Sequence, residues 1–286
     1  MEQISPHVYI SSDHGACTVG AVRTSEGVVL VDAPNRATGA VRWREEVKSL
    51  GEVRYLINTE HHVDHVFGNH FLPGVIIANH YTKENFYQEG FHGKGSAAGP
   101  SRLLDPVGYT KDEDPEGIGL VADYRPREPE IVFRGGLTIG LGDVEIEVFE
   151  AAGHMPANTV VYVREDRVLF TGDNIFNRVM TWFHECLPRE WLKTLDRLKQ
   201  FEIAVVVPGH GKPGGMEIID EMRQVVEDAI GRVQSAIDSG MSREEAAGWV
   251  TFEDLQPVLD RLRHRLPGLQ RVFVGRVYDQ LQGEQP

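Results

Sequence analysis

The sequence predicts a layered α/β fold in which short strands alternate with helices, and three observations lead to this prediction. Runs rich in β-branched residues are separated by Gly, Pro, Asn and Asp, which is typical of strands joined by turns. Stretches with a helical repeat of apolar residues lie between some of these runs. The order of strands and helix in the first half of the 286-residue chain recurs in the second half.

The first half begins with strands and ends in an irregular segment. Apolar runs predict strands at residues 7–11, 17–24, 27–33, 53–58 and 75–79, and helices are predicted at 36–50 and 82–88. Gly51 ends the first helix, because glycine readily takes the left-handed conformation that often follows a helix. Residues 91–130 contain eleven Gly or Pro and the acidic run 111–116, so we expect a long irregular insertion there.

The second half ends in helices. Strands are predicted at residues 131–133, 137–142, 144–152, 159–165, 167–173 and 203–209, and a helix at 188–201. From residue 216 onward, apolar residues recur every three or four positions; Ser242 and Glu245 form a capping box, and Pro267-Gly268 separates the last two helical stretches. We therefore expect one body over residues 1–215, with an insertion at about 91–130, and a helical extension over 216–286 packed on it.

The composition excludes several classes of protein. The chain has 43 acidic and 29 basic side chains, a net charge of −14 and no basic cluster, so nucleic acid is not an expected partner. No run reaches the roughly 18 apolar residues of a membrane span, and the first residues lack signal-peptide features. We therefore expect a cytoplasmic protein without membrane contact, whose two cysteines, Cys17 and Cys186, are reduced thiols.

Candidate metal ligands follow the strand predicted at 53–58. The segment Glu60-His61-His62-Val63-Asp64-His65 places imidazoles and carboxylates at one strand end, where they would repel or desolvate one another without a cation. Three later ligands, His154, Asp173 and His210, each stand beside a glycine at the end of an apolar strand. Because ligands delivered from strand ends can converge on one edge of a sheet, the sequence predicts a metal site there.

These motifs resemble the metallo-β-lactamase superfamily, whose signature H-x-H-x-D-H precedes a later His, an Asp in a T-G-D-like turn and a His in a P-G-H-like turn. The likeness covers roughly residues 5–215 and implies a four-layer αββα sandwich with two divalent ions at one edge. It implies that Glu60, His62 and His154 hold one ion, that Asp64, His65 and His210 hold the other, and that Asp173 bridges them. Asp32 and Thr59 would be outer hydrogen-bond partners of these ligands.

Glu60 departs from the family pattern, because the first ligand of the signature is a histidine. His61 cannot take that place without moving the other ligands out of register, so we expect its side chain to point elsewhere. The added carboxylate removes one positive charge from the site and favours harder ions, so manganese or iron competes with zinc, which remains the expected metal. Alternatively, Glu60 acts as a general base beside a single ion held by Asp64, His65 and His210.

The resemblance implies a metal-dependent hydrolase in which a bridging hydroxide attacks an electrophilic carbon of a small molecule, with Asp64 and Glu60 as catalytic residues. The carbon belongs to an ester, thioester, lactone or amide, or to an activated aromatic ring. Two alternatives stay open: an iron-dependent oxygenase or redox enzyme of the same fold, and a non-catalytic partner subunit. Substrate contacts are expected from Trp182, Phe183 and His184, and from Phe91 and His92 in the insertion. The C-terminal helices are expected to support a homo-oligomer.

Overall fold

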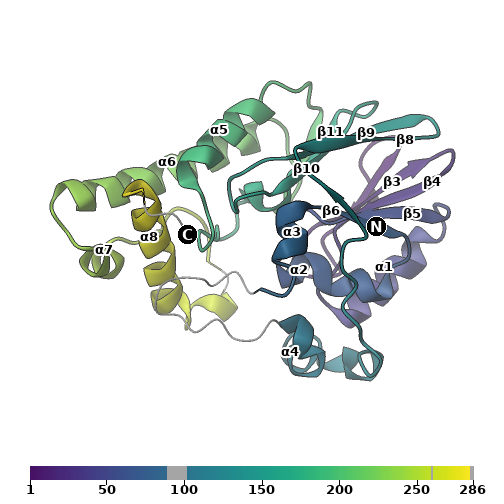
Figure 1. Cartoon of the computed structure of the whole chain (residues 1–286), viewed down its shortest axis with the longest axis horizontal. Coiled ribbons are helices and arrows are strands. Elements are labelled where there is room, and N and C mark those ends of the chain that lie inside the picture. Colours follow the sequence, from purple (N-terminus) through teal and green to yellow (C-terminus); the bar gives the residue numbers. More distant parts are fainter. Residues whose placement is uncertain (89–101, 259, 284–286) are drawn as a thin grey trace.

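Two main sheets form the centre of the molecule in the computed structural model, which describes residues 1–88, 102–258 and 260–283 (Figure 1). The first sheet has its strands in chain order: β1 (Glu2–Gln3), β2 (Val8–Ser11), β3 (Val19–Thr24), β4 (Gly27–Val31), β5 (Val53–Ile57), β6 (Val75–Asn79) and β7 (Ile131–Phe133). The second runs β13 (Val205–Val207), β11 (Val168–Phe170), β10 (Thr159–Val163), β9 (Val144–Glu150) and β8 (Gly136–Leu141). A small parallel pair joins β12 (Phe176–Asn177) to β14 (His210–Gly211).

The two sheets pack face to face through branched aliphatic side chains. Val29, Val31 and Ile57 of the first sheet share one buried cluster with Val161 and Phe170 of the second. Successive residues of a strand point to opposite faces, so a strand that is apolar at every position is suited to burial on both sides. Strand β10 is buried at every position and β4 at every position after Gly27, and each strand lies inside its sheet.

Helices cover both outer faces, which makes four layers. Helix α1 (Ala37–Val47) packs on the first sheet, where Trp43 joins a buried cluster with Leu30 and Leu56. Helix α5 (Pro188–Leu198) packs on the second sheet through Trp191 and Leu195. The layered α/β fold that the sequence predicts is confirmed.

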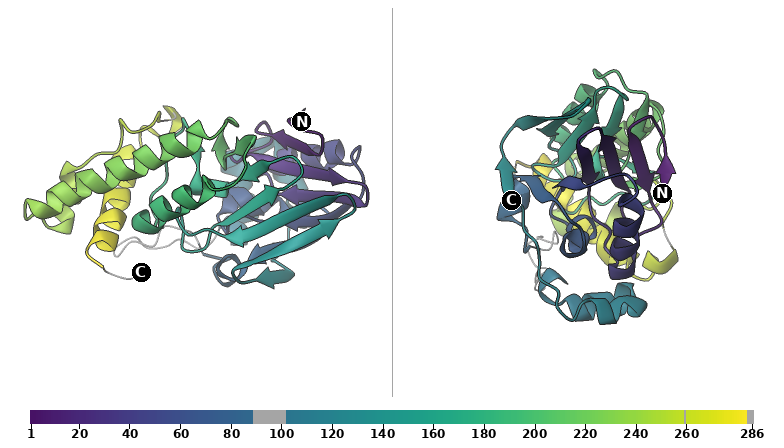
Figure 2. Two further views of the ribbon diagram at one scale, coloured as in Figure 1. Left: turned by 90° about the horizontal axis from the view of Figure 1, so that it is seen from above. Right: turned by 90° about the vertical axis from the view of Figure 1, so that its right-hand side faces the viewer.

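The C-terminal helices continue the layer outside the second sheet. Helix α6 (Glu217–Asp238) lies against α5, while α7 (Arg243–Trp249) and α8 (Leu266–Leu281) pack against α6 and each other. Figure 2 shows α6 and α8 extending away from the sheets. Ser242 and Glu245 form the predicted capping box. Pro267 and Gly268, however, lie in the first turn of α8 instead of between two helices, because a proline N–H is not needed there.

The predicted irregular insertion is more ordered than expected. Beyond the undescribed residues 89–101 come a 3₁₀ turn at Arg102–Leu104, helix α4 (Pro106–Glu113) and a second 3₁₀ segment at Pro115–Leu120. The Asp105 side chain caps α4 by accepting a hydrogen bond from Gly108 N at 3.0 Å, and Tyr109 packs edge-on against Phe67. The prediction of an irregular chain is therefore wrong for residues 102–120.

Two smaller points complete the description. Helix α3 (His80–Glu84) begins earlier than predicted, because Asn79 caps it by accepting a hydrogen bond from Thr82 N at 2.8 Å. Further 3₁₀ segments lie at Phe67–Phe71 and Asp260–Leu262. Among the residues described above, no helix combines the length and the apolar character needed to cross a membrane.

Candidate metal centre

Strand ends bring the predicted ligands together at one edge of the two sheets. Parallel pairing of β4 with β5 and of β11 with β13 puts the carboxyl ends of each pair on the same side. Glu60 follows β5, Asp173 follows β11 in a 3₁₀ turn (Gly172–Asn174), and His210 follows β13. The short helix α2 (Val63–Val66) carries Asp64 and His65 at the same edge.

Asp64, His65 and His210 form one group of side chains beside Asp173. His210 Nε2 lies 3.2 Å from Asp64 Oδ2 and 3.3 Å from Asp173 Oδ2. His65 Nε2 lies 3.2 Å from Asp173 Oδ1 and 2.9 Å from Glu60 Oε1. Asp64, His65 and His210 each offer one ligand atom within 4.8 Å of the other two, a spacing that one metal ion could bridge.

Glu60, His62 and His154 form the adjoining group. Glu60 Oε2 lies 2.7 Å from His62 Nδ1 and 3.6 Å from His154 Nε2. His154 Nε2 lies 3.8 Å from Asp173 Oδ2, so Asp173 stands between the two groups. The two oxygens of Glu60 face different groups, with Oε1 toward His65 and Oε2 toward His62. The structure thus brings all seven predicted ligands to one place.

Two of the imidazoles are oriented by backbone carbonyls. His154 Nδ1–H donates a hydrogen bond to the carbonyl of Trp182 at 2.8 Å, and His210 Nδ1–H donates to the carbonyl of Ala16 at 2.9 Å. A neutral imidazole carries one ring proton, so in each case the lone pair of Nε2 points at the carboxylates of the centre.

His65 is oriented by a buried carboxylate. His65 Nδ1–H donates to Asp32 Oδ2 at 2.9 Å, and Asp32 also accepts bonds from Thr59 N and Thr59 Oγ1, both at 2.7 Å. Asp32 is 2% exposed and has a positive φ of 59°. Burial raises the pKa of Asp32, against the opposing effect of His65 and Thr59.

The centre contains several buried ionisable groups whose polar atoms lack hydrogen bonds. Glu60 Oε1, His65 Nε2 and Asp173 Oδ1 have no hydrogen-bond partner among the described residues. Burial alone would lower the pKa of His210, but Asp173 and Asp64 raise it to about 10. Burial and Asp173 would raise the pKa of Glu60, but the surrounding imidazoles lower it to about 2. Divalent cations fit this donor set, because they replace imidazole protons and satisfy carboxylate oxygens.

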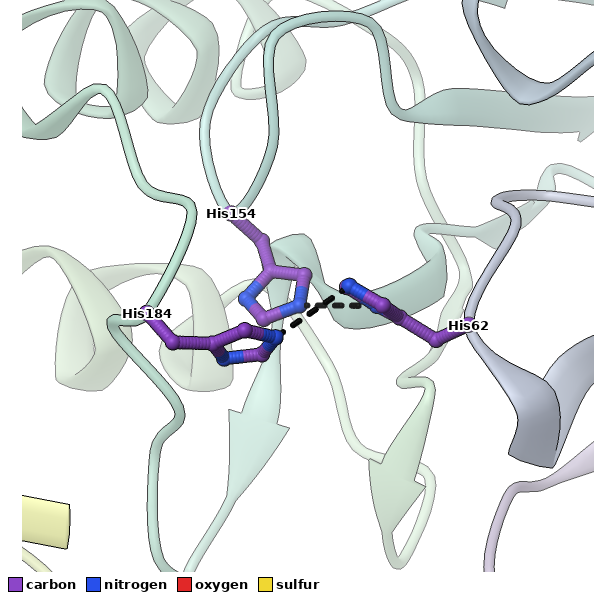
Figure 3. Close-up of side chains that lie close together, drawn as sticks. All are labelled: His62, His154 and His184. Carbon is purple, nitrogen blue, oxygen red and sulfur yellow. Dashed lines mark hydrogen bonds between the residues drawn. The ribbon is translucent and has the colours of Figure 1, made fainter. Parts of the chain in front are cut away.

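Three further side chains lie beside the His62 ring, and two of them contact Nε2, the ring nitrogen that does not face Glu60. His184 Nε2 is 3.2 Å from His62 Nε2, and Figure 3 shows the rings of His62, His154 and His184 pointing toward one another. Glu185 Oε2 lies 3.5 Å from His62 Nε2 and 3.7 Å from His61 Nε2. The sequence predicts His184 as a substrate contact and gives no prediction for Glu185. The available signal was an adjacent imidazole and carboxylate shortly after Asp173.

A cavity of about 230 Å³ opens over the centre. Trp182 and His184, two of the predicted substrate residues, line it. Phe183 does not: it is 1% exposed and its ring packs against Trp191 and Phe252, which corrects that prediction. Phe91 and His92 lie outside the described residues. The remaining lining includes apolar side chains and two arginines, namely Val63, Val179, Met180, Leu262, Arg102 and Arg265.

Helix α8 supports the loop that carries His184 and Glu185. Arg276 Nε donates a hydrogen bond to the carbonyl of Cys186 at 3.0 Å, and Arg276 Nη2 donates to the carbonyl of Glu185 at 3.1 Å. The Phe273 ring lies 6.5 Å from that of His184. The wall of the centre therefore rests on a helix more than eighty residues further along the chain.

Comparisons with known proteins agree with this architecture. The family model described as the metallo-beta-lactamase superfamily matches residues 12–210. A linear primary-alkylsulfatase from Pseudomonas sp. (strain ATCC 19151) is 24% identical in an alignment of 237 residues that covers 73% of this chain and 44% of that protein. A metallo-beta-lactamase type 2 from Bacteroides fragilis is 30% identical in an alignment of 145 residues that covers 49% of this chain and 58% of that protein. The chain thus spans about half the length of these relatives.

One solved structure resembles nearly the whole chain. The stereoselective inverting sec-alkylsulfatase Pisa1 from Pseudomonas sp. covers 99% of this chain and 50% of its own, with a TM-score of 0.65 at 14% sequence identity. At this identity the likeness concerns the fold, and it includes the C-terminal helices. Because the family model matches well over half of the sequence, the chain belongs to the metallo-β-lactamase superfamily.

Proposed function

We propose that the chain is a metal-dependent hydrolase whose centre holds two divalent ions. The ligands would be Glu60, His62, Asp64, His65, His154, Asp173 and His210. The observation that carries the proposal is the orientation of the imidazoles. His65, His154 and His210 are each fixed by a hydrogen bond on Nδ1, and each presents Nε2 to a carboxylate oxygen. Histidine ligands of metals are oriented in this way, through a hydrogen bond on the nitrogen that does not bind the ion.

In the proposed reaction, the metal ions and the side chains have different roles. Bound divalent ions lower the pKa of water and polarise the oxygen of the bond to be cleaved. The Asp64 side chain is 24% exposed, whereas that of Asp173 is 6% exposed and that of Glu60 is fully buried. Asp64 also lines the cavity. It is therefore the carboxylate that orients the attacking water and accepts its proton, and Glu60 acts as a ligand.

The cavity favours a small ester with an anionic group as the substrate. Arg102 and Arg265 line the cavity together with Glu113, and the other carboxylates of its lining, Asp64 and Asp173, are proposed metal ligands. The two guanidinium groups would attract an anionic group on the substrate. Val179, Met180 and Trp182 provide an apolar wall for the rest of the molecule. Because one relative is an alkylsulfatase, sulfate esters join carboxylic esters, thioesters, lactones and amides as candidate substrates.

The donor set supports a second candidate, an iron-dependent redox enzyme. Glu60, Asp64 and Asp173 make the centre richer in oxygen ligands than the all-histidine form of the signature. Carboxylates favour manganese and iron relative to an imidazole-rich site, which favours zinc. Such an enzyme would consume oxygen during turnover, whereas a hydrolase would not.

Assays on the metal-loaded protein test both candidates. The protein would be prepared with zinc, manganese or iron and assayed with alkyl sulfates, carboxylic esters, thioesters, lactones and β-lactams, while oxygen uptake is recorded. We expect ester hydrolysis that is lost on chelation, restored by metal and abolished in Asp64→Asn. The control His80→Gln removes an imidazole that bonds Glu150 outside the centre, at 2.9 Å, and should keep activity. Oxygen uptake without hydrolysis would favour the redox enzyme, and a protein that binds no metal would contradict both.

A further inference from the structure

The glutamate that replaces the first histidine of the signature leaves the centre one imidazole short. A third imidazole nevertheless lies beside His62 and His154. It belongs to His184, which is 7% exposed and comes from the loop between β12 and α5 (Figure 3). One ligand atom from each of His62, His154 and His184 lies within 4.8 Å of the other two. Three imidazoles around one point are a frequent ligand set for zinc.

The contact between Glu60 and His62 has the length of a hydrogen bond and not of two ligands on one ion. Two donors bound to zinc at tetrahedral angles lie about 3.3 Å apart, because each Zn–ligand bond is about 2.0–2.1 Å long. His62 Nδ1 and Glu60 Oε2 are only 2.7 Å apart, which matches a charge-assisted N–H···O bond. In the neutral ring, a proton on Nδ1 leaves the lone pair of His62 on Nε2.

Two contacts of His62 Nε2 have distances expected of ligands, whereas the Nε2 atom of His154 lies 3.4 Å from His62 Nδ1. His184 Nε2 lies 3.2 Å from His62 Nε2 and Glu185 Oε2 lies 3.5 Å from it, both close to the tetrahedral separation. A hydrogen bond between the two rings would also explain the first distance. It would leave Glu185 Oε2 without a hydrogen bond among the described residues, beside His61 Nε2 at the longer distance of 3.7 Å. A buried carboxylate without a hydrogen bond is costly, and a cation beside it removes that cost.

We propose, on the basis of the proposed metal-dependent function, that His184 takes the place of the missing imidazole. One ion is held by His62, His154 and His184, with Glu185 facing it. Glu60 turns to the other ion: its Oε1 lies 2.9 Å from His65 Nε2, in the group of Asp64, His65 and His210. The substitution in the signature is thus compensated in space by a residue more than a hundred positions away.

The two positions then differ in chemistry. The His184 position is rich in imidazole, which suits zinc, whereas the other position has up to three carboxylates, which suit manganese or iron. A single equivalent of zinc should therefore fill the imidazole-rich position first. X-ray absorption at the zinc edge of such a sample should count three imidazoles per ion, whereas the assignment of Glu60, His62 and His154 to one ion gives two. This measurement needs no variant.

Substitution of His184 provides the second readout. Metal-free native protein, His184→Ala and the control His80→Gln would be titrated with zinc, and bound zinc would be measured by elemental analysis. We expect about two ions per native chain, about one per His184→Ala chain, and no change in the control. The affinity of the lost ion should fall by more than the roughly 10–100-fold caused by removing an outer hydrogen-bond partner. Thermal unfolding of the metal-free proteins would show that the variant folds.

The outcomes separate this inference from the proposed function. Two imidazoles per zinc, or an affinity loss in His184→Ala within the range of an outer partner, would overturn the inference while leaving a metal-dependent hydrolase intact. Failure of the native protein to bind metal or hydrolyse any ester would instead contradict the proposed function. Three imidazoles together with the loss of one ion in the variant would support the assignment.

Discussion

The charge of Asp32 is expected to be essential for the order of the metal centre, and Asp32→Asn isolates it. Asparagine has the same shape and tolerates the left-handed conformation that Asp32 adopts at φ 59°. The substitution therefore removes the negative charge and changes the hydrogen-bonding capacity of the group while keeping its shape. It leaves one acceptor oxygen and introduces an NH₂ group that faces donors.

The magnitude follows from the contacts. Asp32 accepts hydrogen bonds from Thr59 N and Thr59 Oγ1 at 2.7 Å and from His65 Nδ1 at 2.9 Å. Hydrogen bonds to a charged group contribute about 1.5–3 kcal/mol each, and breaking a buried charged pair typically costs about 3–5 kcal/mol. We expect the metal-free variant to lose about 3–5 kcal/mol of unfolding free energy. We also expect weaker metal binding by roughly 10–100-fold, because His65 loses its orientation.

Urea unfolding in the presence of a chelator measures the first effect, and zinc titration of the metal-free protein measures the second. Asp143→Asn is the control, since Asp143 also accepts a backbone bond, from Ser25 N at 2.7 Å, but its side chain is 55% exposed. The control should leave the unfolding free energy almost unchanged, because its carboxylate is exposed. If Asp32→Asn matches the control in both measurements, the orienting role of Asp32 is refuted.

Four further outcomes are expected. Hydrogen bonding to Asp166 raises the pKa of His7, and hydrogen bonds lower the pKa of Asp166 against the effect of burial. Both groups are charged between about pH 4 and 6.5, so the pair stabilises the folded state in that range. In urea unfolding, His7→Gln should therefore cost up to about 1 kcal/mol at pH 5.5 but little at pH 9. Trp191→Ala should cost about 3–5 kcal/mol, since the ring is fully buried, whereas Trp249→Ala, 68% exposed, should cost almost nothing. Glu60→His should shift metal competition from manganese toward zinc, as measured by elemental analysis. Saturating zinc at about a thousand times Kd should stabilise the fold by about 4 kcal/mol over the chelated form, visible as a higher Tm.

Most of the fold could be predicted from local sequence, because buried strands and amphipathic helices carry strong local patterns. Strand β10 is a short run rich in valine and α5 has one apolar stripe, so the sequence predicts both. Helix α4 was missed, because Gly and Pro dominate its neighbourhood and its burial depends on Tyr109 meeting Phe67 from a distant segment. The sequence predicts a boundary at Pro267, although the same residue also suits the first turn of a helix, where the structure places it.

Some residues of the candidate site could likewise be predicted from local sequence, whereas others depend on distant packing. Glu60, Asp173 and His210 could be proposed from the sequence because each stands directly at the end of an apolar strand, and strand ends meet at a sheet edge. His184 and Glu185 lie in a loop without regular structure, whose position depends on packing against α8. No local pattern encodes that contact. His61 is expected to point elsewhere than the first ligand position, and its buried ring lies with Nε2 3.7 Å from Glu185 Oε2, which is none of the predicted ligands.

The hydrogen bonds from Arg276 to the carbonyls of Glu185 and Cys186 make the position of this cavity wall depend on helix α8. A change that destabilises the packing of α8, such as proteolytic cleavage or a substitution in its apolar face, would make the loop of His184 and Glu185 more mobile. It would do so without changing any of the seven predicted ligands. Substitutions in α8 are therefore expected to alter substrate preference while the strands that carry the proposed ligands stay unchanged.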